Sequence, residues 1–377
     1  MALCGLAWSK GKRTGNRPWN SMDSSLSVDF PPLVSAYMKK VLARLEAAEG
    51  KQAQEWHRAL ARQLLPSQEE ELILPCELAD PLGAGHHQAT ERMVHQYKNR
   101  VLVLTTSRCF AHCRYCFRKN LIAQSYADKK HCLEPASCGG LYGWPNSQEL
   151  EKMCQYLAAH PEVQEILLSG GDPMTAPLER LEEMIQAFRK ARPGVLIRLC
   201  TRSTVFHPKL FTPQLVEGLR ALRPLWVIPH INHPVEISED YAPESRQALC
   251  SLVDAGIPVQ SQTVLLRGVN DTVATLSQLF HQLTVLGVKP GYLFQCDMVA
   301  GTSHLRLPVE EGIRLYHQLR QELSGLSCPV YGVDLPGGGG KFNLLELDST
   351  LNPTQVERLE ECYQFTKADG SVWEYPR

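Results

Sequence analysis

The chain has 377 residues, of which 44% are hydrophobic and 21% charged, and its formal net charge is −1 at pH 7. This composition is typical of a globular protein with one large domain, and the balanced charge argues against a nucleic-acid-binding protein. Apolar runs stay below the roughly 18 residues of a membrane span, so no membrane partner is expected either. The 13 cysteines are odd in number and scattered, which suits reduced thiols in a cytoplasmic protein.

The first part of the chain predicts a tail followed by helices. Residues 1–25 are polar and irregular, and their basic residues follow the mildly apolar start, which is the wrong order for a secretory signal. Met22 is an alternative start of the protein. Apolar residues recur at helical spacing across 33–64, with a break at 48–50. We therefore expect residues 26–95 to form a helical segment that packs as a cap on the main domain.

Strand-like and helical stretches alternate from residue 101 onward. The strand-like runs are 101–107, 165–169, 195–201, 226–231, 259–265 and 292–296, and amphipathic stretches between them include 147–159 and 176–191. Such alternation predicts an α/β fold with a parallel sheet. We expect the main domain at 96–345, with a long loop at 121–146. Residues 346–377 are expected to form a C-terminal tail, to which the sequence assigns no function.

Three closely spaced cysteines follow the first strand-like run. They are Cys109, Cys113 and Cys116, in a Cys-x3-Cys-x2-Cys pattern. Thiolates are the usual ligands of a [4Fe–4S] cluster, and three of them leave one iron free to bind a substrate or cofactor. A structural zinc site is the alternative, but it needs four ligands, usually in paired Cys-x2-Cys elements. The spacing therefore predicts a cluster with one open iron.

Four glycines precede a lysine near the end of the main domain, in the segment from Pro336 to Lys341. This segment is not a phosphate-binding loop, because Leu335 and Phe342 stand where that motif needs a glycine and a hydroxyl residue. It is also too short, and too closely tied to a strand-like segment, for a flexible linker. We interpret Lys341 as an amine that forms a Schiff base, usually with pyridoxal phosphate, with the glycines letting it reach the cofactor.

These motifs together resemble a known family. The cysteine triplet with Tyr115 before its third cysteine, and the Leu-Leu-Ser-Gly-Gly-Asp-Pro turn at 167–173, resemble the radical S-adenosylmethionine (SAM) superfamily. With the glycine–lysine segment, the chain resembles the lysine 2,3-aminomutase family from about Asp80 to Lys341, including strings at 97–100, 230–234, 262–271 and 295–297. The resemblance implies a partial (β/α)6 TIM-like radical SAM barrel with an N-terminal helical segment. Periodicity alone would also allow a doubly wound sheet.

The resemblance also implies cofactors and a role for each matching residue. The cofactors are a [4Fe–4S] cluster on the three cysteines, S-adenosyl-L-methionine and pyridoxal 5′-phosphate. Residues expected to bind S-adenosylmethionine are Ser169, Gly170, Gly171, Asp172, His230 and Gln262. The catalytic Lys341 would carry pyridoxal phosphate, and Arg100 would bind its phosphate. Arg118 would bind the substrate carboxylate, and Asp297 and Asp334 would bind the substrate's distal ammonium.

The charges of these residues indicate the substrate. Asp297 and Asp334 each follow a strand-like segment, at the strand ends where barrel enzymes place their sites. Two carboxylates that face one pocket repel each other unless a cation lies between them, whereas the planar guanidinium of Arg118 suits a carboxylate. A surface-turn role for either acid is the alternative. The set predicts a long cationic α-amino acid, with L-lysine as the first choice and arginine as the alternative.

We therefore expect an isomerase that interconverts L-α-lysine and β-lysine, with reduced flavodoxin or ferredoxin as electron donor. The alternatives are an aminomutase for a protein-bound lysine, of the elongation factor P type, and a non-catalytic iron–sulfur carrier. Known lysine aminomutases have a structural zinc site built from one cysteine after the Asn-Asp pair and three near the C-terminus. Here Thr272 follows that pair and only Cys362 follows the glycine–lysine segment. We expect no such zinc, and a homo-oligomer is left open.

Overall fold

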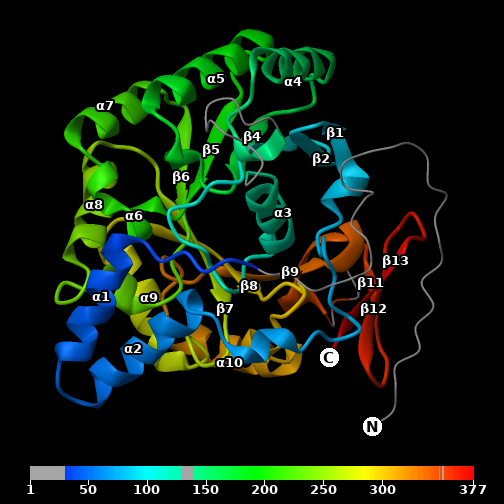
Figure 1. Ribbon diagram of the computed structural model, residues 1–377. Helices are drawn as coiled ribbons and strands as arrows, with labels where there is room; N and C mark the ends of the chain where they lie inside the picture. Colours follow the sequence, from blue (N-terminus) through cyan, green and yellow to red (C-terminus); the bar gives the residue numbers. More distant parts are fainter. Residues whose placement is uncertain (1–29, 130–139, 348, 350–351) are drawn as a thin grey trace.

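The fold is an open barrel of parallel strands (Figure 1). The computed structural model describes residues 30–129, 140–347, 349 and 352–377, so the expected tail at 1–25 lies outside the described residues. One sheet contains the parallel strands β3 (Arg100–Thr106), β4 (Glu165–Gly170), β5 (Leu196–Thr201) and β6 (Leu225–Pro229). A second contains β7 (Gln260–Leu265), β8 (Lys289–Gln295) and β9 (Val330–Leu335), also parallel. Parallel bridges at Val227–Val259 and His230–Gln262 connect the two sheets.

The predicted partial barrel is therefore confirmed. β9, at the strand-like segment expected before Asp334, adds a seventh parallel strand to the six units of the expected barrel. Antiparallel strands lie at both edges: β2 (Met93–Tyr97) pairs with β3, β1 (Gln88–Thr90) pairs with β2, and β10 (Gly340–Asn343) pairs with β9. Since β1 and β2 belong to this sheet, the expected helical segment 26–95 is helical only in its first part.

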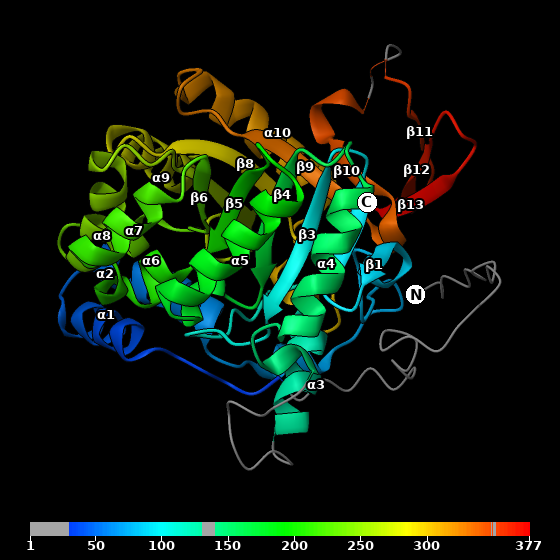
Figure 2. The ribbon, with the colours of Figure 1, turned by 90° about the horizontal axis from the view of Figure 1, so that it is seen from above.

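Amphipathic helices cover the outside of the strands, as Figures 1 and 2 show. They are α4 (Ser147–Ala159), α5 (Leu178–Ala191), α7 (Pro213–Ala221), α8 (Pro243–Asp254), α9 (Val273–Val285) and α10 (Val309–Glu322). In α5 the buried residues Leu181, Met184, Ile185 and Phe188 recur at helical spacing, which places one apolar stripe against the sheet. The hydrophobic core therefore forms between the apolar faces of the helices and the strands. The ends of the strands lie outside this core, where a site can form.

Two N-terminal helices pack beside the barrel, as expected. α1 (Ala36–Ala47) and α2 (Lys51–Leu64) are separated at the predicted break, where Gly50 takes a φ of 104°. The expectation of a loop at 121–146 is partly wrong, because α3 (Lys119–Lys129) forms directly after the cysteines, and residues 130–139 are not described. That helix lacks an amphipathic pattern; its first backbone bonds come from the cysteine loop, with Lys119 N–H donating to Cys116 O at 3.0 Å.

Residues 352–377 form a small sheet where no element was expected. It is antiparallel and consists of β11 (Gln355–Arg358), β12 (Cys362–Thr366) and β13 (Val372–Pro376), drawn in red in Figure 1. The remaining short elements are α6 (Ser203–Phe206) and the 3-10 turns η2 (Gln68–Glu71), η3 (Ala84–His87), η4 (Gly140–Tyr142), η5 (Pro173–Thr175), η6 (Pro208–Leu210), η7 (Pro234–Ile237), η8 (Ser303–Leu305), η9 (Pro336–Gly338) and η10 (Leu344–Glu346). Among the described residues, every helix is too short or too polar to cross a membrane.

Candidate active site

The cysteine loop begins where β3 ends. Burial raises the pKa of Cys109 well above its usual value, and the nearby carboxylate of Asp172 and the other cysteines add to this effect. Burial also raises the pKa of Cys116 to about 12, with repulsion from Cys113 as the second cause. The sulfurs therefore lie close enough to repel one another as thiolates. Such thiols ionise only when a strong cation binds them, so the group fits iron.

One cluster cysteine has a partner that sequence reasoning missed. Arg202, directly after β5, donates from Nη1 to Sγ of Cys113 at 2.9 Å. Its Nη2 donates to Gln63 Oε1 at 2.8 Å and to Glu236 Oε1 at 2.7 Å. Both Arg202 and Glu236 are buried. The sequence offered only one signal for this contact, an arginine at the end of a strand. The contact itself joins Arg202 to Cys113, which lies 89 residues away in the chain.

The glycine turn at 170–171 packs against the base of the cysteine loop. Gly170 has a φ of 110°, and the N–H of Gly171 donates to Thr106 O at 2.5 Å. The next N–H, of Asp172, donates to Arg108 O at 2.7 Å. A Cβ at Gly171 would collide with the backbone of Ser107 and Arg108. Glycine is therefore required here because the two backbones touch.

The substitution Gly171→Ala is expected to displace the cysteine loop. Because the colliding atoms are backbone atoms, the free energy of unfolding should fall by about 1–3 kcal/mol, and the iron content after reconstitution should fall with it. Thermal unfolding and iron analysis measure the two effects. Gly325→Ala is the matched control: like Gly171, Gly325 has no positive φ, but a Cβ there meets no atom within 4 Å. Equal iron content in both variants would contradict the prediction.

Two of the residues expected to bind S-adenosylmethionine are already engaged by the protein. The buried carboxylate of Asp172 accepts hydrogen bonds from Thr201 Oγ1 at 2.8 Å, Ser203 Oγ at 2.8 Å, and the N–H groups of Met174 and Arg202 at 3.0 Å. It thereby ties the end of β4 to the end of β5. Ser169 Oγ accepts a hydrogen bond from Nη1 of Arg118 at 3.1 Å. Gly170 and Gly171 lie between these two contacts.

His230 directly follows β6 and Gln262 lies on β7, beside the cysteine loop. The two residues form one of the two parallel bridges that connect the sheets. Nε2 of His230 lies 2.9 Å from Asn232 Oδ1 and 3.5 Å from the hydroxyl of Tyr115 in the cysteine motif. Burial, and then the charge of Arg202, lower the pKa of His230 to about 3, so the ring is neutral. The structure thus brings a neutral imidazole and an amide to one side of the predicted cluster.

Lys341 and Asp334 are direct cross-strand partners. They face each other in the antiparallel pair of β9 and β10, and Nζ of Lys341 lies 2.9 and 3.1 Å from the two carboxylate oxygens. The ammonium also lies 3.9 Å from the ring centre of Phe294 and 5.2 Å from that of Tyr292. The site therefore already holds one primary ammonium between a carboxylate and two aromatic rings.

Asp297 supplies a second carboxyl group beside Lys341 and Asp334. Burial raises its pKa to about 8, and repulsion from Asp334 is the next cause; the positive charges of Lys341 and Arg118 oppose the shift. Burial in turn lowers the pKa of Arg118, while the charges of Cys116, Asp80 and Asp297 oppose that shift. Arg118 thus lies within electrostatic reach of both the cysteine loop and the acid pair. The predicted substrate residues are brought together as one set of opposite charges.

Arg100 lies beside the backbone of the lysine strand. Its guanidinium stacks over the ring of Tyr97 at 3.8 Å, and the hydroxyl of Tyr97 accepts a hydrogen bond from the N–H of Lys341 at 2.9 Å. Arg100 also donates to Asn99 Oδ1 at 3.2 Å. Tyr97 thus links the guanidinium of Arg100 to the strand of Lys341, which fits a cationic group near one end of a cofactor on that lysine.

Close packing holds the glycine run in place, in agreement with the sequence argument against a flexible linker. The N–H of Gly337 donates to Pro81 O at 2.9 Å, and Gln96 Nε2 donates to Gly338 O at 3.0 Å. A Cβ on Gly339 would lie 2.7 Å from the ring of Trp373. We call residues 80–97 on one side and 367–375 on the other the loop clamp. Glycine is needed because neighbours touch the backbone from both sides.

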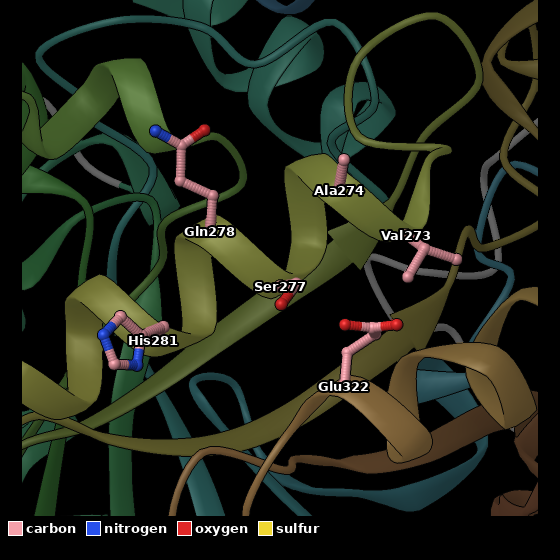
Figure 3. Close-up of a pocket in the computed structure, with 6 residues that line it drawn as sticks. All are labelled: Val273, Ala274, Ser277, Gln278, His281 and Glu322. Atoms are coloured by element: carbon pink, nitrogen blue, oxygen red, sulfur yellow. The ribbon is translucent and has the colours of Figure 1, made fainter.

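Other candidate features do not match this site. Figure 3 shows the residues that line a pocket between α9 and α10, which are Val273, Ala274, Ser277, Gln278, His281 and Glu322. It shares no residue with the site. His95, His160 and Glu162 also approach one another, within 4.8 Å. One ring nitrogen of each histidine already has a protein partner: Nδ1 of His160 contacts Glu162 at 2.8 Å, and Nδ1 of His95 contacts the hydroxyl of Tyr156 at 2.8 Å.

The chain is similar in sequence to proteins of known family. The family model of the radical SAM superfamily matches residues 103–280. A provisionally named L-lysine 2,3-aminomutase of Treponema pallidum is 46% identical over 380 residues, covering 100% of this chain and 99% of that protein. The L-lysine 2,3-aminomutase of Fusobacterium nucleatum is 36% identical over 75% of this chain, and the match spans 62% of its own length. A similar match, 36% identical, covers 70% of an Aquifex aeolicus protein.

Proposed function

The chain belongs to the lysine 2,3-aminomutase family of the radical SAM superfamily, and from that membership we propose that it is an isomerase that interconverts free L-α-lysine and β-lysine. One observation carries the choice of substrate. Asp334 already binds a primary ammonium, that of Lys341, beside the second carboxyl of Asp297. A lysine substrate presents the same chemical group.

The described residues fit the cofactors of this reaction. The three recessed thiols fit a [4Fe–4S] cluster, and Lys341 offers an amine for pyridoxal phosphate with Arg100 beside its backbone. When bound, the cluster, S-adenosylmethionine and pyridoxal phosphate supply a 5′-deoxyadenosyl radical and a ring that allows an amino group to migrate. The neutral His230, with Gln262, Ser169 and the glycine turn, would hold S-adenosylmethionine near the open iron. The cofactors carry the difficult chemistry, and the chain positions them.

The protein's own part is to fix the substrate at its two ends. Arg118 would bind the α-carboxylate, and Asp297 with Asp334 would bind the distal ammonium. Lys341 would hold pyridoxal phosphate through the same Nζ that contacts Asp334. A bound cofactor would therefore compete with Asp334 for this nitrogen, and a substrate ammonium could take its place beside the carboxylate. Phe294 and Tyr292 line the same place and would shield the ion pair from water.

The test is an anaerobic assay of the reconstituted protein. It is loaded with iron, sulfide and pyridoxal phosphate, then mixed with S-adenosylmethionine, a reductant, and L-lysine, L-arginine or L-glutamate in separate reactions. Mass-resolved chromatography should detect β-lysine in the first reaction alone. Formation of β-arginine instead would show that L-arginine, the alternative cationic amino acid, is the substrate. Release of 5′-deoxyadenosine without any β-isomer would oppose free amino acids and favour a protein-bound lysine.

We further propose a cytoplasmic enzyme that receives electrons from reduced flavodoxin or ferredoxin. The cluster chemistry needs a low-potential electron donor, and a reducing compartment preserves the cluster thiols. Among the described residues, Cys109, Cys113 and Cys116 form no disulfide, which is compatible with that compartment.

Lysine affinity is expected to depend on pH through Asp297. Because its pKa is raised to about 8, Asp297 is protonated at pH 7 in the substrate-free protein and ionised above pH 8. The substrate ammonium favours the ionised form, so binding at pH 7 should release a proton. The affinity for L-lysine should therefore increase as pH rises from 6.5 to 8 and level off above it. Calorimetry in two buffers with different ionisation enthalpies measures the proton release.

The matched variant is Asp297→Asn, which cannot release a proton. Its lysine affinity should be lower at pH 8, and the part of the pH dependence between 6.5 and 8 should disappear. If the wild-type protein takes up or releases no proton on binding lysine at pH 7, the protonated state assigned to Asp297 is wrong.

A further inference from the structure

The sheet of β11–β13 lies against the loop that carries Lys341. The ring of Trp373 packs on Gly339, where a Cβ would come within 2.7 Å of it. Nζ of Lys367 donates a hydrogen bond to Gly339 O and lies 4.5 Å from the ring centre of Trp373. The ring of Phe365 meets Phe342, the neighbour of Lys341, edge to face at 5.0 Å. Figure 2 shows β10 and β13 on the same side of the molecule.

The same sheet also touches the strand end that carries Asp297. The hydroxyl of Tyr375 donates to Cys296 O at 3.3 Å, one residue before Asp297. The side chain of Tyr375 is 2% exposed, so this contact is made inside the protein. One small sheet therefore reaches both halves of the proposed ammonium site, through Trp373 on one side and Tyr375 on the other.

Ion pairs attach the sheet to the outer helix of the barrel. Glu310 of α10 accepts hydrogen bonds from Arg358 at 2.5 Å, Arg377 at 2.9 Å and the hydroxyl of Tyr363 at 3.2 Å. Glu310 is the second residue of α10. These bonds fix the sheet to a helix that packs on the barrel, so that Trp373 and Tyr375 are presented to the site by a rigid support.

We propose that the sheet β11–β13 is a positioning element of the active site, in which Trp373 and Lys367 hold the Lys341 loop and Tyr375 holds the Asp297 strand end. The roles given to Lys341 and Asp297 rest on the proposed function. The contacts that the sheet makes with their segments do not depend on it. Neither Trp373 nor Tyr375 would touch the reacting atoms. They act by fixing the distance between the cofactor lysine and the acid that binds the substrate's far end.

The first test measures the loop directly. In Trp373→Ala, backbone hydrogen exchange of the peptide that contains residues 336–343 should be faster by about tenfold or more, because the loop loses its packing partner. Trp373→Phe should largely restore slow exchange. Val372→Ala is the control, since Val372 is on the same strand but 51% exposed. Lys367→Met, which removes the bond to Gly339 O and the ammonium beside the Trp373 ring but keeps the ring itself, provides a milder variant if Trp373→Ala fails to fold.

The second test measures function through two separate quantities. Trp373→Ala should weaken pyridoxal phosphate binding by about tenfold, about 1.4 kcal/mol, with unchanged iron content. Tyr375→Phe should leave that affinity unchanged and raise KM for L-lysine a few-fold. Exchange and cofactor affinity equal to wild type in both Trp373→Ala and Lys367→Met would overturn the proposal. A wild-type protein that binds no pyridoxal phosphate would instead overturn the proposed function, while the exchange experiment still tests the contacts.

Discussion

Replacing Lys341 with alanine is expected to abolish the visible absorbance band of the Schiff base with pyridoxal phosphate and to lower β-lysine formation by about 10³-fold or more. The reason is that this amine alone would hold the cofactor covalently at the end of the substrate site. The cysteine loop is built from β3 and the glycine turn after β4, without any contact to Lys341 among the bonds described above. Iron and sulfide content should therefore stay at the wild-type level.

The matched variant Lys341→Arg separates two roles of this lysine. Lysine also forms the ion pair with Asp334, at 2.9 Å, which alanine removes and arginine can keep. Both variants should lose the Schiff-base band, because a guanidinium does not form it. Only the alanine variant should also be less stable to heat, since Asp334 loses its cation. An unchanged band in Lys341→Ala would refute the cofactor assignment.

The substitution Asp334→Asn should lower kcat/KM for L-lysine by about 100-fold or more. Removing one member of a hydrogen-bonded charge pair in a recessed site commonly costs roughly 3 kcal/mol, which corresponds to this factor. The side chain of Asp334 is 20% exposed, so water can replace only part of the lost contact. Steady-state kinetics with saturating S-adenosylmethionine measures the effect.

Two controls distinguish a substrate contact from a general loss of charge. Asp240→Asn removes the same charge at an exposed position outside the site and should leave the kinetics unchanged. L-norleucine, which lacks the distal ammonium, should bind Asp334→Asn at least as well as wild type, because an unpaired carboxylate no longer faces its methyl end. If both enzymes discriminate lysine from norleucine equally, Asp334 does not bind the ammonium.

The sequence predicted the barrel and the cysteine loop because local signals encode them. Most parallel strands from β3 to β8 are short runs of mostly apolar residues between turn residues and amphipathic helices, and the cysteines follow the first of them directly. β7 is more polar and alternates buried with partly exposed residues. The stripe of α5 is visible in the sequence alone. The glycine turn was also predicted as a special site. Its close contact with the backbone of Arg108 could not be predicted, because that contact depends on the register between β3 and β4, which three-dimensional packing determines.

Contacts between distant segments could not be predicted. Arg202 meets Cys113 across 89 residues, and no local pattern marks that pairing. Lys341 and Asp334 were assigned separately to cofactor and substrate, but their own ion pair depends on the hairpin register of β9 and β10. The strands β11–β13 were missed because β11 is mostly exposed and short, while Trp373 and Tyr375 pack against elements far away in the sequence.

The loop clamp has a consequence for the order of events during biosynthesis. Gln96 meets Gly338 across 242 residues, and Tyr97 meets Lys341 across 244. The partners on the other side, Lys367 and Trp373, are translated after the lysine itself. In a nascent chain in which Lys341 has just been exposed, this residue therefore has packing partners on one side only. We expect cofactor capture to follow translation of β13 rather than to accompany chain growth, so that ribosome-bound chains stalled before Lys367 would not retain pyridoxal phosphate.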